Sequence, residues 1–115
     1  MTMSFTLLMS GVIVGRSALE NRDATRRVVR GAFRPGLGYD LVQPIFELYD
    51  SAGDDEDALA RYRKARQALR LQLTNSSGTA IAVRDLHISK DTSASKPTLV
   101  LEVETDDPTI WHDGV

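Results

Sequence analysis

The stretch LRLQLTNSSGTAIAV, residues 69–83, carries the clearest structural signal in the chain. Its leucines at positions 69, 71 and 73 alternate with polar residues, and a period of two is the spacing of side chains on one face of a β-strand. Gly78 closes a short polar segment, and a three-residue loop that ends in a left-handed glycine is a common hairpin connection. The stretch therefore predicts a β-hairpin.

The loop length sets the register of this hairpin. With residues 76–78 as the loop, Leu73 lies opposite Ile81 and Leu71 opposite Val83, which places four apolar side chains on one face. A four-residue loop would pair the leucines with alanines and bury less apolar surface. We therefore expect the first register.

The apolar pattern changes parity after the hairpin. Leu86 and Ile88 lie on the opposite parity from Ile81. A β-bulge near Arg84-Asp85 would bring both sets to one face.

Other short apolar runs predict further strands, at Phe5–Val14, Val28–Phe33, Leu41–Tyr49 and Leu99–Val103. The first run is apolar on both faces, as in a central strand. The third contains Pro44, which has no backbone donor, so we expect it at a sheet edge or a bulge. Turns are expected at the breaks between these runs, at residues 34–38, 51–53 and 91–97.

One segment predicts a helix. Four acidic residues at Asp54–Asp57 precede a basic stretch, an order that the helix dipole favours. Apolar residues then recur at helical spacing, forming one narrow stripe that suits a helix lying on a sheet: Ala58, Tyr62, Ala65 and Leu69. Residues 18–27 are compatible with a second helix, capped by Ser17 and Glu20, and equally with a strand and loop.

Five or six strands with one helix indicate a mainly β fold, either an antiparallel β-sandwich or a barrel-like domain with one surface helix. The alternative is an α+β domain with one helical layer. The length of 115 residues fits a single domain, 1–115, in which residues 106–115 could form a tail.

The composition excludes several protein classes. The chain is 42% hydrophobic and 26% charged, which is ordinary for a globular domain, and it contains no cysteine. The longest apolar run, Phe5–Val14, is too short to cross a bilayer as a helix. No basic residue precedes it, which argues against a signal peptide. We expect a cytoplasmic protein with no membrane contact.

The net charge of −2 conceals strong segregation. Residues 39–60 carry seven acids and no base, whereas the arginines are concentrated before them, at positions 16, 22, 26, 27, 30 and 34. Guanidinium groups suit carboxylates and phosphates. Arg26, Arg27, Arg30 and Arg34 could therefore bind an anion, a nucleic acid or an acidic partner. We favour the alternative, in which these arginines pair with acids of residues 50–57 and 102–107 in the same chain or in a neighbour, because the protein is acidic overall and no aromatic residue lies among the arginines.

Motifs for catalysis are missing from the sequence. It has no nucleophile elbow, no Walker loop and no dinucleotide-binding glycine motif. Asp85, His87, His112 and Asp113 could converge on a metal ion only if the chain end folded back, and their spacing matches no metal signature. We therefore expect no catalytic residue, no metal and no cofactor.

The chain end contains the single tryptophan, Trp111, beside Ile110. These two residues could anchor the chain in a partner's groove, or could cover the domain's own core. The sequence favours a non-enzymatic interaction or structural module that self-associates or joins a larger assembly. Binding of an anionic ligand or nucleic acid is the alternative, and a metal-dependent enzyme comes third.

Overall fold

The computed structural model describes residues 4–91, 98–108 and 110. Within these ranges ten elements follow one another: β1 (Phe5–Met9), β2 (Val12–Ser17), β3 (Asn21–Asp23), β4 (Val28–Pro35), α1 (Tyr39–Ala52), α2 (Glu56–Ala68), β5 (Leu71–Thr74), β6 (Ala80–Ile81), β7 (Asp85–Asp91) and β8 (Thr98–Glu104). The strands form one antiparallel sheet in the order β6-β5-β1-β2-β4-β8-β7, with β3 paired to β4. The expected mainly β class is confirmed, and the antiparallel sheet is accompanied by two helices where the sequence predicted one.

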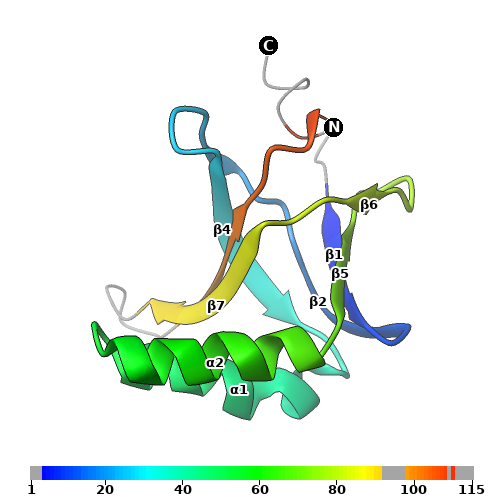
Figure 1. The fold of residues 1–115 in the computed structure, drawn as a ribbon. Coiled ribbons are helices and arrows are strands. Elements are labelled where there is room, and N and C mark those ends of the chain that lie inside the picture. Colours follow the sequence, from blue (N-terminus) through cyan, green and yellow to red (C-terminus); the bar gives the residue numbers. More distant parts are fainter. Residues whose placement is uncertain (1–3, 92–97, 109, 111–115) are drawn as a thin grey trace.

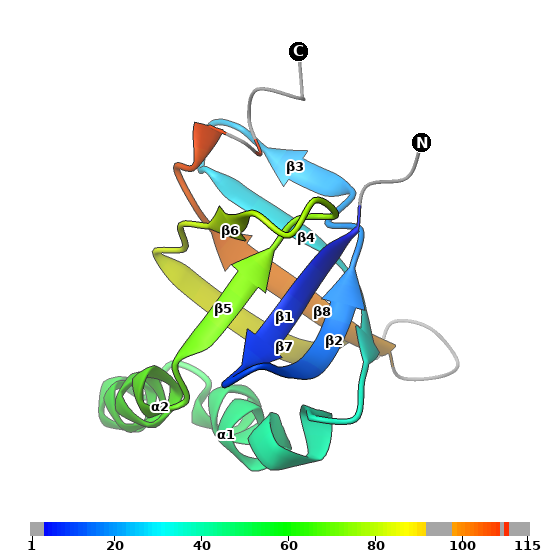
Figure 2. The same cartoon turned by 90° about the vertical axis from the view of Figure 1, so that its right-hand side faces the viewer.

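The sheet curls until the chain itself joins its two edges. β6 at one edge and β7 at the other are consecutive strands, separated by residues 82–84. At this junction the Arg84 amide donates to the Glu104 carbonyl at 2.8 Å, and the Thr105 hydroxyl donates to the Ala82 carbonyl. Residues 80–91 therefore pair first with β5 and then with β8, which closes the sheet into a barrel (Figure 2).

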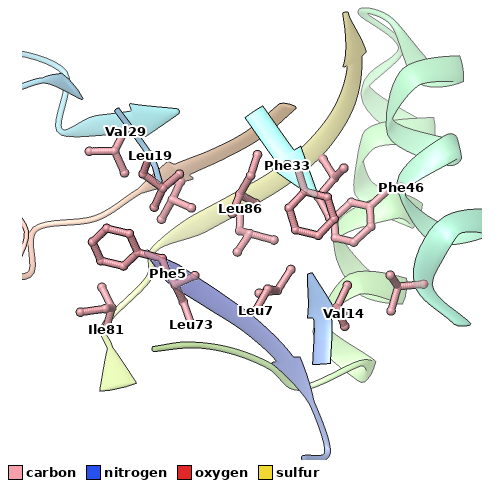
Figure 3. Close-up of a cluster of buried hydrophobic side chains, with 14 of the residues drawn as sticks. Phe5, Leu7, Val14, Leu19, Val29, Phe33, Phe46, Leu73, Ile81 and Leu86 are labelled. Carbon is pink, nitrogen blue, oxygen red and sulfur yellow. The ribbon is translucent and has the colours of Figure 1, made fainter. Parts of the chain in front are cut away.

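Alternate strand residues fill the barrel, as expected for a barrel of this size. Phe5 and Leu7 of β1 and Leu73 of β5 are at most 1% exposed. Figure 3 shows their side chains converging with Leu86 in one apolar interior. The core is therefore built mainly from the strands.

Both helices cover one end of the barrel, where they lie side by side (Figures 1 and 2). Their inner faces complete the core through Val42 and Phe46 of α1 and Tyr62 of α2. The rings of Phe46 and Tyr62 are 6.1 Å apart between centroids. Because residues 53–55 link the helices tightly, α1 and α2 are antiparallel neighbours, with Phe46 level with Tyr62.

The hairpin and the helix predicted first from the sequence are both confirmed. Leu73 pairs with Ile81 across a loop in which Gly78 has φ +83°. In α2 the Asp55 side chain caps the first turn by accepting from the amides of residues 57 and 58. The chain also extends as a strand and turn over residues 21–27, so the helical alternative for residues 18–27 is wrong.

The predicted pairing of Leu71 with Val83 and the bulge near Arg84-Asp85 are wrong. The β5–β6 ladder ends at Ile81, because the chain leaves β5 there and joins β8. The parity change between Ile81 and Leu86 reflects this exchange of partner strands.

The prediction of one strand over Phe5–Val14 is also wrong. Ser10 and Gly11 have φ values of +50° and +84°, which make a two-residue hairpin turn between β1 and β2. β2 then contains a bulge, since Leu7 pairs with Gly15 and Leu8 with Ile13. The bulge leaves Val14 without a partner in this ladder.

Residues 41–49 were expected to form an edge strand, and this expectation is wrong because they belong to α1. Val42, Phe46 and Tyr49 recur at spacings of four and three, so the apolar residues have a helical period that the pattern of short runs obscured. Pro44 lies inside the helix on its exposed side. Burial of one face outweighs the backbone bond that Pro44 cannot donate.

We predict that Pro44→Ala stabilises the monomeric fold. Alanine would restore an amide donor for the Asp40 carbonyl, and proline costs about 3 kcal/mol relative to alanine inside a helix. Because the site tolerates Pro44 in the native chain, we expect a gain of roughly 1–2 kcal/mol in the free energy of unfolding, measured with urea. A loss of stability would contradict the helical assignment of residues 39–52.

Candidate functional site

The outward face of α1 exposes an apolar stripe. Leu41 and Leu48 are 61% and 45% exposed, and the exposed Pro44 lies between them. The spacing of three and four residues places all three on one side of the helix, opposite the buried Val42 and Phe46. We call Leu41, Pro44 and Leu48 the α1 stripe.

Acidic side chains border the α1 stripe. α1 contains Asp40, Glu47 and Asp50 and no basic residue. Glu47 reaches Lys90 of β7 at 3.9 Å, and both side chains are half exposed. A partner surface for this face should therefore be basic and should offer room for leucine side chains.

The outward face of α2 has the complementary character. Its exposed positions include the bases Arg61 and Lys64 and the small residues Ala60 and Ala68. The two helices lie side by side in one layer at the same end of the barrel (Figure 2). The acidic face of α1 and the basic face of α2 are therefore neighbours. We call the two exposed faces together the helical layer.

A second feature is a hollow on the barrel wall beside β2 and β4. Its volume is about 650 Å³. Arg16 and Arg34 border it, and they are direct partners in the β2–β4 ladder. In the part of the chain that the structure describes, no carboxylate forms an ion pair with either arginine.

The four arginines predicted as an anion site are not gathered at one point. Arg34 borders the hollow, and Arg30 lies on the same exposed face of β4, where it pairs in register with Glu102 of β8. Arg26 and Arg27 lie in the turn before β4. The strand β4 is eight residues long, so its two ends are roughly 25 Å apart, and this turn is far from Arg34 at the other end. The fold instead places Arg16 beside Arg34.

Two arginines of this region, Arg27 in the turn and Arg22 in β3, interact with groups of the same chain. Arg27 approaches Asp106 at 3.8 Å, and both side chains are largely exposed. The guanidinium of Arg22 donates to the carbonyl of Ile110 at 2.7 Å. This part of the arginine cluster therefore fits the alternative of contacts within the chain.

Ile110 belongs to the domain's own core, where it is 1% exposed. The Thr105 amide donates to the Arg27 carbonyl at 3.0 Å, which brings the segment after β8 back to the barrel. The side chain of Ile110 is therefore not available to anchor a partner in this fold. Trp111, like His112, lies outside the described residues.

A polar network joins α2 to β7. The Tyr62 hydroxyl lies 2.9 Å from His87 Nδ1, and His87 Nε2 lies 3.2 Å from the Asp85 carboxylate. Arg66 completes the network with an ion pair of 2.5 Å to Asp85 and a bond of 2.7 Å to the Leu86 carbonyl. These contacts hold α2 against the barrel.

The protonation state of His87 follows from its neighbours. A guanidinium nitrogen of Arg66 lies 3.3 Å from Nδ1, so Nδ1 is an acceptor and the proton is on Nε2, toward Asp85. The Tyr49 ring stacks on the imidazole at 4.1 Å. Burial lowers the pKa of His87 below its ordinary value of 6.5, although Asp85 opposes this shift. Burial also raises the pKa of Tyr62 to about 12.

Asp85 and His87 do lie together, as the metal hypothesis required, but both imidazole nitrogens already face protein groups. Among residues 4–91, 98–108 and 110, no three potential metal ligands gather in a group. In the same part of the chain, no helix has the length and apolar content needed to cross a bilayer.

Sequence reasoning missed both the helical layer and the network. The α1 stripe was hidden by the assignment of residues 41–49 to a strand, although its spacing was readable. The pairing of Arg16 with Arg34 depends on the register of the β2–β4 ladder, which no local pattern marks.

Comparison of the chain with protein-family models, with curated proteins and with solved structures finds no match.

We predict that His87 makes the fold less stable in mild acid. Because burial favours the neutral imidazole, the folded state binds a proton less readily than the unfolded state. The stabilisation is therefore complete above pH 6.5 and is lost as the pH falls through the lowered pKa of His87. The free energy of unfolding in urea, measured at about pH 8 and at pH 5, gives this loss of stability, because the two pH values bracket the ordinary pKa of histidine.

The matched variant is His87→Gln, which keeps hydrogen-bonding capacity without titrating. Its free energy of unfolding should change less between the two pH values than that of the native chain. Equal changes in both proteins would show that His87 does not contribute.

Proposed function

We propose that the protein is a non-enzymatic structural module that self-associates through its helical layer. The observation that carries the proposal is the α1 stripe, with Leu41 and Leu48 at 61% and 45% exposure on a helix that contains no basic residue. The exposed Pro44 lies between them, so the α1 stripe forms one contiguous apolar patch, and such patches mark interaction sites. We propose that a second copy of the chain covers the α1 stripe.

The alignment of α1 with α2 supports binding of a second copy at the α1 stripe. Because Phe46 is level with Tyr62, Leu48 is level with Ala60, and Leu41 with Gln67, the residue before Ala68. A two-fold rotation about an axis parallel to the helices leaves the position of each residue along that axis unchanged. It places α1 of one copy over α2 of the other. Leu48 then meets the exposed Ala60, and Leu41 lies within one residue of the exposed Ala68, so large residues pack near small ones, as dense packing favours.

Charge also supports the two-fold arrangement. The acids of α1, including Glu47, would lie over Arg61 and Lys64 of the partner copy, and the two helices would run antiparallel, so that their dipoles oppose favourably. A two-fold axis perpendicular to the helices would instead bring α1 against α1, with acid facing acid. Complementary charge therefore selects one arrangement, a closed dimer with a four-helix layer.

Such a dimer would serve as a building block or as an accessory subunit of a larger assembly. A cytoplasmic location is part of this proposal, since a chain without cysteine suits a reducing compartment. Nucleic acid is not the expected partner of the helical layer, because half of the layer is acidic.

The first test is the mass in solution by light scattering across a concentration series. We expect a dimer, and we expect Leu48→Ser to weaken it. Each leucine contributes about 1–2 kcal/mol of apolar burial, and the symmetric dimer loses two, so the dissociation constant should rise by roughly two orders of magnitude. Leu37→Ser is the control, because Leu37 is exposed outside the α1 stripe.

A charge test uses Arg61→Glu with Lys64→Glu. This double variant should dissociate more readily, whereas Arg26→Glu with Arg30→Glu, which changes the net charge equally, should remain dimeric. The native dimer should also weaken at high salt, because exposed charges are screened over about 10 Å at 0.1 M salt. A native monomer at every concentration and salt would overturn the proposal, as would equal behaviour of the two double variants.

A further inference from the structure

The hollow beside β2 and β4 has the features of a small binding site that is separate from the helical layer. We propose that it binds a carboxylate on an apolar body, with Arg16 and Arg34 holding the carboxylate. This inference does not rest on self-association, since one copy supplies every residue that it uses.

The two arginines lie next to each other on the barrel wall. Arg16 and Arg34 are partners in the β2–β4 ladder, and side chains directly opposite on antiparallel strands have Cβ atoms about 5 Å apart. Like charges at such positions repel. Both side chains are exposed, and in the described ranges no acid forms an ion pair with either. One anion between the two guanidinium groups would turn this repulsion into two charge-assisted contacts.

The hollow beside these arginines has the shape of a site for an apolar group. Its walls carry small residues at four positions: Gly15, Ala18, Ala32 and Gly36. A Cβ atom added at Gly36 would lie 3.0 Å from the Ile13 carbonyl, so a larger side chain there would crowd this wall. Ile13 and Pro35 add apolar surface. The hollow therefore suits an apolar body next to the acid group.

A carboxylate at the edge of the hollow limits the negative charge that a ligand can carry. Glu20 also borders the hollow, and its carboxylate accepts from the Ala32 amide at 3.4 Å. Ala32 is two positions from Arg34, so this negative charge is roughly 7 Å along β4 from the arginine pair. A nucleic acid or another polyanion would place negative charge against Glu20. A ligand with a single acid group avoids this repulsion.

Two sources share this chemistry: a free short-chain carboxylic acid, and an acidic side chain flanked by apolar residues in a protein segment. Hexanoate is the probe for the first, and the capped peptide acetyl-Leu-Glu-Leu-amide is the probe for the second. Acetate, which lacks the apolar body, and inorganic phosphate, which carries more charge, are the comparison ligands.

The experiment is calorimetric titration at low salt, with thermal unfolding as a second readout, because a ligand that binds only the folded state raises the unfolding temperature. We expect hexanoate or the peptide to bind more tightly than acetate and phosphate. Arg16→Gln and Arg34→Gln should each weaken that binding by about tenfold or more, the loss expected for a charged hydrogen bond.

The matched control is Arg30→Gln, which removes an arginine from the same exposed face of β4 but outside the hollow. It should bind as the native chain does. Arg16→Gln and Arg34→Gln should still fold, with unfolding temperatures at or above that of the native chain, because each removes one of two repelling charges.

Tighter binding of hexanoate would identify the free acid as the ligand class, and tighter binding of the peptide would identify the protein segment. The inference is overturned if neither probe binds at up to about 10 mM, which is beyond the millimolar range of weak sites. It is also overturned if phosphate binds best, or if Arg30→Gln weakens binding as much as Arg34→Gln. Repeating the titration with Leu48→Ser separates this result from the dimer, since a monomer should bind equally well.

Discussion

The closure of the sheet by residues 80–91 is the constraint on which the rest of the structure depends. This stretch pairs with β5 at its start and with β8 afterwards, so both edges of the sheet are used by one continuous segment. A closed barrel encloses its apolar side chains laterally and leaves only its ends to be covered. The connection between β4 and β5 contains α1 and α2, which cover one end with Val42, Phe46 and Tyr62. The network of Tyr62, Arg66 and His87 then fixes the position of α2 on β7.

Local sequence patterns predicted the elements whose formation depends mainly on residues close to one another in the chain. The β5–β6 hairpin follows from alternating leucines and Gly78, and the start of α2 follows from the acids that precede it. α1 was missed because Pro44 and a dense apolar run resemble an edge strand, although Val42, Phe46 and Tyr49 have helical spacing. The exchange of strand partners after Ile81 and the bulge at Val14 depend on distant residues, so no local pattern could show them.

The same distinction applies to the candidate sites. The sequence showed an arginine-rich region but not which of its members would meet, because the ladder that brings Arg16 to Arg34 involves two strands. It also suggested Ile110 as an anchor, whereas the fold places this residue in the core. The two proposed surfaces differ in kind: the helical layer offers leucines and alanines with complementary charge, and the hollow offers two arginines beside a small apolar space. We propose the first for assembly and the second for recognition of a ligand.

The central claim is that α1 of one copy lies over α2 of another, and disulfide cross-linking tests it most directly because the native chain has no cysteine. One chain carries Leu48→Cys, and a second chain, distinguished by a size tag, carries Ala60→Cys. A disulfide forms readily only where Cα atoms are about 4.4–6.8 Å apart. The account predicts that the mixed pair cross-links much faster than either variant links to itself. Failure of the mixed pair to cross-link, or equally fast linking of Leu48→Cys to itself, would contradict it.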